Sequence, residues 1–149
     1  MTAPAGRRDL ARQAIFGSSD GLMSILGPVM FFASRNPRLV FPVALMGAVS
    51  ASASMAAGEQ MSEQATDWAA VAVMGLATFT GSVLPAFPYL FTRGLPAAGL
   101  TAAACMAVAV AVGHLRSWRK RRYAETLAIL AVVAALTAAC NLLVPGGAG

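Results

Sequence analysis

Five long apolar stretches, joined by short connections, constrain this chain more than any other feature of its sequence. They lie at residues 14–34, 39–61, 68–91, 96–115 and 123–144. A helix that spans the hydrocarbon core of a bilayer needs about 20 mostly apolar residues, and each stretch has that length. The pattern predicts an all-α, polytopic membrane protein with five transmembrane helices, forming a single transmembrane domain over residues 1–149.

The composition agrees with this fold class. Hydrophobic residues make up 58% of the chain and charged residues 11%, whereas an ordinary soluble domain carries about 25% charged residues. A domain of this size cannot hide such an apolar excess from water. The chain has one His, and no Ser/His/Asp or Cys/His set lies at one depth. We therefore expect neither an enzyme nor a nucleic-acid-binding protein.

The placement of the basic residues predicts the orientation in the membrane. With the N-terminus inside, the inner side carries Arg7, Arg8, Arg12, Arg116, Arg119, Lys120, Arg121 and Arg122. The outer side then carries only Arg35, Arg38 and Arg93. Because short inner loops are enriched in Lys and Arg, we expect a cytoplasmic N-terminus and an external C-terminus in the cell (inner) membrane.

Asp20 is the only charged residue in the first predicted span. It lies six residues from the start of that span, about 9 Å along a helix. An ionised side chain in the bilayer core costs about 2.5–3.5 kcal/mol on insertion scales, and such a residue marks a functional site by default. The alternative is an aspartate near the headgroups that stabilises a helix start.

The second predicted span carries a matching set on one helical face. Met55 lies six residues before the end of that span, at nearly the depth of Asp20, and Glu59 follows one turn later. Glu63 continues this face into the loop. Carboxylate oxygens with a thioether favour an iron-like divalent ion over magnesium or calcium, and the carboxylates can take up protons when the metal leaves. The alternatives are a packing role for Met55 and a snorkelling Glu59.

Two features of the first span predict what surrounds Asp20. Pro28 has no N–H for the carbonyl of Ser24, one turn beyond Asp20, so Ser24 is a candidate oxygen ligand. The alternative is a plain kink with this carbonyl satisfied by water or a side chain. Gly17 and Gly21 form a GxxxG pair that permits close approach of another helix. We expect that contact to join two copies of the chain in a homodimer.

Three motifs, in order along the chain, resemble those of the vacuolar iron transporter family, which includes nodulin-like iron and manganese transporters. Residues 17–24, GSSDGLMS, resemble its DGL signature on the first helix. Residues 54–59, SMAAGE, resemble its second-helix motif, and residues 81–91, GSVLPAFPYLF, its third-helix motif with two prolines. The order and spacing of the five predicted spans agree with the family, so the resemblance covers nearly the whole chain.

The resemblance implies a homodimer with the metal path at or near the subunit interface. It implies exchange of Fe(II), and often Mn(II), for protons, with transfer from the cytosol to a vacuole or out of a bacterial cell. The family's first-helix aspartate and second-helix methionine and glutamate correspond to Asp20, Met55 and Glu59. The expected function is proton-coupled export of Fe(II) or Mn(II), with the bilayer, the metal and protons as partners and no resident cofactor.

Two departures from the family pattern bear on this expectation. Many members insert a glutamate-rich cytoplasmic domain between the second and third helices, whereas the link here is only about residues 62–67. Metal capture must then rely on Glu59, Glu63 and Asp67. Gln60 stands where the family has a tyrosine. The missing domain leaves a second function open, a membrane interaction subunit that keeps the fold without transport.

Overall fold

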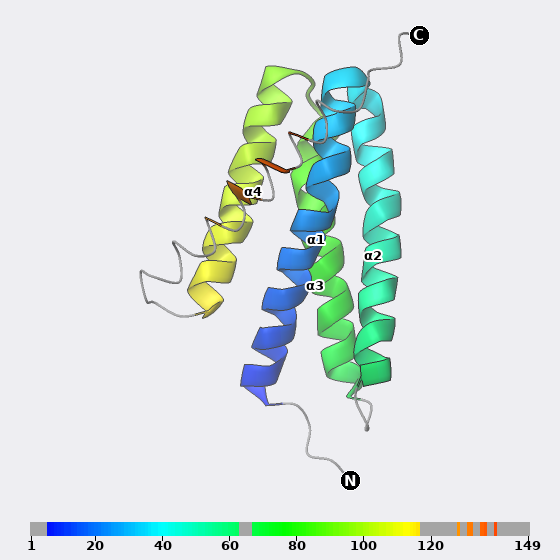
Figure 1. The fold of residues 1–149 in the computed structure, drawn as a ribbon, viewed down its shortest axis with the longest axis vertical. Helices are drawn as coiled ribbons and strands as arrows, with labels where there is room; N and C mark the ends of the chain where they lie inside the picture. Colours follow the sequence, from blue (N-terminus) through cyan, green and yellow to red (C-terminus); the bar gives the residue numbers. More distant parts are fainter. Residues whose placement is uncertain are drawn as a thin grey trace.

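The chain folds as a helical bundle in the computed structural model, which describes residues 6–62 and 67–116 and positions 128, 131, 132, 135, 136 and 139. The elements are α1 (Arg7–Arg35), η1 (Pro37–Leu39), α2 (Val40–Ser62), α3 (Trp68–Ala86), η2 (Phe87–Leu90) and α4 (Leu95–Arg116), where η denotes a 3₁₀ turn (Figure 1). Every regular element in this described part is helical, which confirms the predicted all-α class.

Four helical segments are long and apolar enough to cross a bilayer. They cover Asp9–Arg35, Pro37–Met61, Trp68–Leu90 and Leu95–His114. The predicted fifth span, residues 123–144, lies almost entirely outside the described residues, so the described part carries four spans rather than the five predicted. Within that segment the described positions, Ala128, Ala131, Val132, Ala135, Leu136 and Ala139, are helical and exposed.

Helix α1 begins at Arg7, whereas the predicted span begins at residue 14. Gly6 precedes the helix in an extended conformation, and its backbone N–H donates to Oδ2 of Asp9 at 3.2 Å. Asp9 lies in the first turn, where a negative charge stabilises the positive end of the helix dipole. The apolar span is therefore the inner part of a longer helix with a polar first section.

Prolines and one glycine shape the connections between helices. Pro37 opens the η1 turn that leads from α1 to α2. Pro88 lies in η2, where α3 gives way to a 3₁₀ turn. The third helix therefore ends as α-helix at Ala86, before the predicted limit at residue 91. Gly94 has a φ of 69°, a conformation that glycine adopts without a Cβ clash, and the chain enters α4 directly after it.

Helices α1 and α3 form the centre of the bundle. Figure 1 shows α1 lying across α3, with α2 on one side of this pair and α4 on the other. Both α2 and α4 contact α1 and α3, and in the described residues they do not contact each other. Residues on α1 therefore take their surroundings from three neighbouring helices.

The closest contact between helices joins α1 to α3 through small residues. A Cβ built at Gly21 would lie 2.2 Å from the carbonyl oxygen of Thr78, and one at Gly81 would lie 2.4 Å from that of Ser18. No side chain larger than hydrogen fits at either position unless a backbone moves. The Ser82 hydroxyl adds an interhelical hydrogen bond to the carbonyl oxygen of Gly21 at 3.0 Å. Such contacts between small residues are a common way to join helices in membranes, where lipid gives no hydrophobic drive.

This contact changes the partner expected for the GxxxG pair. The sequence predicts a close helix approach at Gly17 and Gly21, and the structure has one. However, a Cβ at Gly17 would lie 2.6 Å from the carbonyl oxygen of Met74, in α3 of the same chain. Because α3 already fills both positions, the glycine pair cannot also form a contact between two copies.

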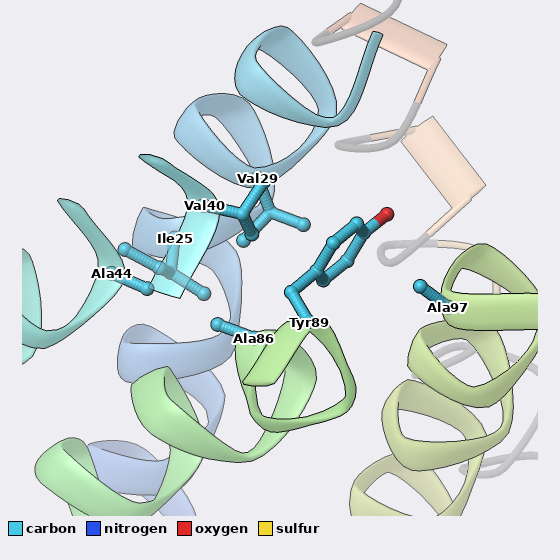
Figure 2. Packing of buried hydrophobic residues seen from close by; sticks show 7 residues of the cluster. All are labelled: Ile25, Val29, Val40, Ala44, Ala86, Tyr89 and Ala97. Atoms are coloured by element: carbon cyan, nitrogen blue, oxygen red, sulfur yellow. The ribbon is translucent and has the colours of Figure 1, made fainter. Parts of the chain in front are cut away.

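An apolar cluster closes the end of the bundle where α1 turns into α2 (Figure 2). It consists of Ile25, Val29, Val40, Ala44, Ala86, Tyr89 and Ala97. The hydroxyl of Thr101 in α4 donates to the carbonyl oxygen of Pro85 at 2.7 Å and fastens α4 to α3 near this cluster. The candidate site residues of α1 and α2 lie between this apolar cluster and the opposite end of the bundle, where Gln13 meets Glu59.

Candidate functional site

Asp20 lies in α1 beside the contact with α3. Its side chain is half-buried, and the next residue, Gly21, touches Thr78. Eight residues, about 12 Å of helix, separate Asp20 from Arg12, and fifteen residues, about 22 Å, separate it from Arg35. The carboxylate therefore belongs to the apolar part of α1, nearer to its N-terminal end.

Ser24 lies one helical turn beyond Asp20 and is exposed. Its hydroxyl donates to the backbone carbonyl oxygen of Asp20 at 2.8 Å, so this hydroxyl is used within the helix. Pro28 lies inside α1, and the helix continues through it to Arg35. A ligand role for the Ser24 carbonyl stays a prediction.

Glu59 lies near the C-terminal end of α2 and contacts α1. Its Oε1 accepts a hydrogen bond from the side-chain amide Nε2 of Gln13, and both side chains are half-buried. A hydrogen bond to a carboxylate is stronger than one between neutral groups. The contact therefore joins the two helices at the end of the bundle where α1 begins.

Two contacts fix the register between the antiparallel helices α1 and α2. Gln13 meets Glu59, and a Cβ at Gly47 would lie 3.1 Å from Cδ1 of Ile25. On each helix the two contacts are twelve residues apart, so the register of the two helices is the same at both contacts. Continued from Glu59, this register places Met55 level with Gly17.

Met55 is thus three residues, about 4.5 Å, closer to the N-terminal end of α1 than Asp20. The sequence places the two at nearly one depth, and the tilt of side chains reduces the difference. Each Cα–Cβ bond on a helix leans towards that helix's own N-terminus. Because α1 and α2 run in opposite directions, Asp20 leans towards the level of Met55 and Met55 towards that of Asp20.

The predicted ligands therefore lie at successive levels along the α1–α2 pair. Glu59 comes first with Gln13, Met55 follows about 6 Å further along α2, and Asp20 lies about 10 Å further along α1 than Gln13. In the described part of the chain no three His, Cys, Asp or Glu side chains gather in one place. Glu63 lies outside the described residues. This arrangement is suited to a path of successive contacts rather than to a closed cage.

Two polar groups that organise this region were not predicted from the sequence. Gln13 lies on one helical stripe with Gly17 and Asp20, at spacings of four and three. This spacing was the sequence signal that could have identified Gln13. The other group is the hydroxyl pair on α3. Thr78 and Ser82 are both buried, and they lie one turn apart against α1. An i, i+4 pair of hydroxyl residues in an apolar helix indicates a helix contact, but not which helix it meets.

A comparison with known protein families finds a match over the part of the chain that carries this region. Residues 11–67 match the model of the VIT family, a segment that contains Gln13, Asp20, Met55 and Glu59 but covers less than half of the chain. No curated protein and no solved structure matches the chain. The match over residues 11–67, on the helices that carry the candidate site, supports membership of this chain in the VIT family, the vacuolar iron transporters.

Proposed function

We propose that this protein carries Fe(II) or Mn(II) across a membrane in exchange for protons. One observation carries the proposal: a half-buried aspartate, Asp20, lies within a membrane-spanning helix that falls inside the VIT family match. Membership of that family supports metal ion transport in general. The side chains along α1 and α2 support the choice of metal and the coupling to protons.

The proposed path begins at Glu59 and ends at Asp20, with Met55 between their levels. Two carboxylates supply the negative charge that a divalent cation needs, and the thioether of Met55 favours Fe(II) over harder ions. Each carboxylate can bind a proton when the metal leaves, because a metal ligand must be deprotonated to bind. Proton release on metal binding then couples the two flows. The metal is the cargo, and the proposal includes no resident cofactor.

The proposed direction is export from the cytoplasm of a bacterial cell. The cytoplasmic assignment of the N-terminus rests on the basic residues at the start of α1 and in the stretch 116–122, which the positive-inside rule places inside. Glu59 then faces the cytoplasm, with Asp20 deeper in the membrane. The fifth span at 123–144 and a cell-membrane location with an external C-terminus belong to the same proposal.

A homodimer is also part of the proposal, on the resemblance to the family alone. The glycine pair of α1 gives it no support, since α3 fills that surface. The side chains of Asp20 and Met55 are only half-buried within the single chain. A second copy beside them would bury the path further.

The short link between α2 and α3 favours one alternative function. Helix α2 ends at Ser62 and α3 begins at Trp68, which leaves no room for an inserted metal-gathering domain. A chain without that domain could serve as a membrane interaction subunit that no longer transports. The retention of Asp20, Met55 and Glu59 on adjoining helices is the reason to prefer transport.

The deciding experiment is metal flux in liposomes that contain the purified protein. We expect Fe(II) and Mn(II) to enter with saturable kinetics when a pH gradient is imposed, with a matching proton flux in the opposite direction. Co(II) and Zn(II) in parallel samples define the selectivity. Metal flux without proton flux would refute the coupling, and no flux above protein-free liposomes would favour the interaction subunit.

A further inference from the structure

The hydrogen bond between Gln13 and Glu59 lies where the proposed path begins. It joins α1 to α2, and a further contact of this helix pair, between Gly47 and Ile25, lies towards the opposite, apolar end. Gln13, Gly17 and Asp20 share one stripe of α1. The amide that holds Glu59 is therefore in line with the carboxylate deeper in the membrane.

The chemistry of an amide suits the task of holding a carboxylate without neutralising it. A glutamine side chain donates through its NH₂ group and carries no charge, whereas Lys or Arg would cancel the negative charge of Glu59. The Gln13 contact is to Oε1 of Glu59. A carboxylate has about four lone-pair positions, and the amide hydrogen bond uses one of them.

On the basis of the metal transport proposed above, we propose that Gln13 is a positioning residue for Glu59. Its amide holds the carboxylate towards α1, in line with Asp20, and thereby sets the metal concentration at which transport is half-saturated. Gln13 does not itself carry the cargo in this scheme. Its loss should affect the capture of the metal more than the rate of the steps that follow.

The first test compares Gln13→Leu with wild type in proteoliposomes, with Mn(II) alone as the probe. We expect the half-saturating concentration to rise about tenfold, since removing a residue that orients a metal ligand commonly changes metal affinity by 10–100-fold. The maximal rate should stay within a factor of about two, because the carboxylates themselves remain. Gln60→Leu is the matched control, since Gln60 is an exposed glutamine on the same turn of α2 as Glu59.

A second readout does not depend on transport. The infrared carboxylate bands of Glu59, identified as those lost in Glu59→Gln, should shift in Gln13→Leu and not in Gln60→Leu. Gln13→Ala serves as a second variant, because it removes the amide with less added bulk. If wild type shows no flux, the transport proposal fails, and the infrared shift still decides whether Gln13 holds Glu59.

Two results would overturn the inference about Gln13. One is an infrared band of Glu59 that does not change when the amide is removed. The other is a loss confined to the maximal rate or to the amount of folded protein, with an unchanged half-saturating concentration. The second result would make Gln13 a brace between α1 and α2 with no part in metal capture.

Discussion

The contacts that α1 makes with α3 and with α2 differ in kind. The contact with α3 is buried and close. Backbone atoms of α3 lie where Gly21 would carry a side chain, and backbone atoms of α1 lie where Gly81 would carry one. The contact with α2, at the end where α1 begins, depends on a half-buried hydrogen bond between the long side chains of Gln13 and Glu59. The first contact cannot change without moving a backbone, whereas the second can change by rotation of two side chains.

This difference assigns separate tasks to the two sides of α1. The side towards α3 fixes the position of the helix, and with it the position of Asp20. The side towards α2 carries Gln13, which donates to the carboxylate of Glu59. The transport proposed above requires a deep carboxylate that stays in place and ligands that exchange partners, and the two kinds of contact suit these two requirements.

The largest effect should follow from filling the contact with α3. Gly21→Val would place a branched side chain against the backbone of Thr78. Overpacking a close contact commonly costs about 1–3 kcal/mol, occasionally more, and a backbone neighbour cannot rotate away. We expect little folded protein, measured as the monodisperse fraction in size-exclusion chromatography. Gly58→Val is the control, since a Cβ at Gly58 meets nothing within 4 Å. Equal yields for the two variants would contradict a rigid α1–α3 contact.

The next effect concerns function alone. Asp20→Asn should lower metal flux about 100-fold or more while the protein stays folded, because the asparagine amide supplies neither the negative charge that a divalent cation needs nor a site for the exchanged proton. Asp9→Asn, at an exposed aspartate in the first turn of α1, should retain flux. Initial rates in liposomes with equal amounts of protein decide the matter. Flux at the wild-type rate in Asp20→Asn would remove this residue from the path.

A smaller effect is expected at Met55, on the side towards α2. Met55→Leu conserves volume, so the fold should tolerate it at a cost below about 1.5 kcal/mol. Loss of the thioether should lower the Fe(II)/Mn(II) flux ratio by about threefold, since Mn(II) depends more on oxygen ligands. Met46→Leu is the control, because Met46 is 74% exposed on α2. An unchanged ratio would leave Met55 as a packing residue beside an oxygen-lined path.

The smallest effect should come from Ser82, which tests whether packing or hydrogen bonding holds α1 to α3. Ser82→Ala removes the hydrogen bond to Gly21 and keeps the close contact. Hydrogen bonds between membrane helices contribute about 0.6 kcal/mol on average, so the unfolding free energy in detergent should fall by about that amount. Ser34→Ala loses only hydrogen bonds within its own helix and should change less. A loss of several kcal/mol would show that the hydroxyl matters more than the glycines.

The comparison also shows which parts of the fold a sequence of this kind can predict. Spans were predictable because length and hydropathy alone decide them, and the limits at 39–61 lie within two residues of the segment Pro37–Met61. The start of α1 at Arg7 was missed, because a capped, charged first turn remains helical without being apolar. The predicted span 68–91 agrees to within one residue with the segment Trp68–Leu90, but hydropathy did not show that its last part, from Phe87, is a 3₁₀ turn.

The candidate site was predictable only as a set of residues and not as an arrangement. A charged residue in an apolar span is conspicuous in the sequence, as Asp20 is, since burying it has a large cost. Gln13 is uncharged and does not stand out in the sequence. Its hydrogen bond to Glu59 could therefore not be predicted without knowing how α1 and α2 pair. A polar side chain acquires its role from the residue that faces it.

The sequence by itself determined that this chain crosses a membrane as helices, because an apolar segment of about 20 residues has no other way to satisfy its backbone in lipid. It also determined which residues are too polar for that setting. Only the tertiary structure decided that Gly17 and Gly21 face α3 of the same chain, and that Gln13 meets Glu59. The physical reason is that a glycine pair or an amide fits many partners, and the register and crossing of the helices select one.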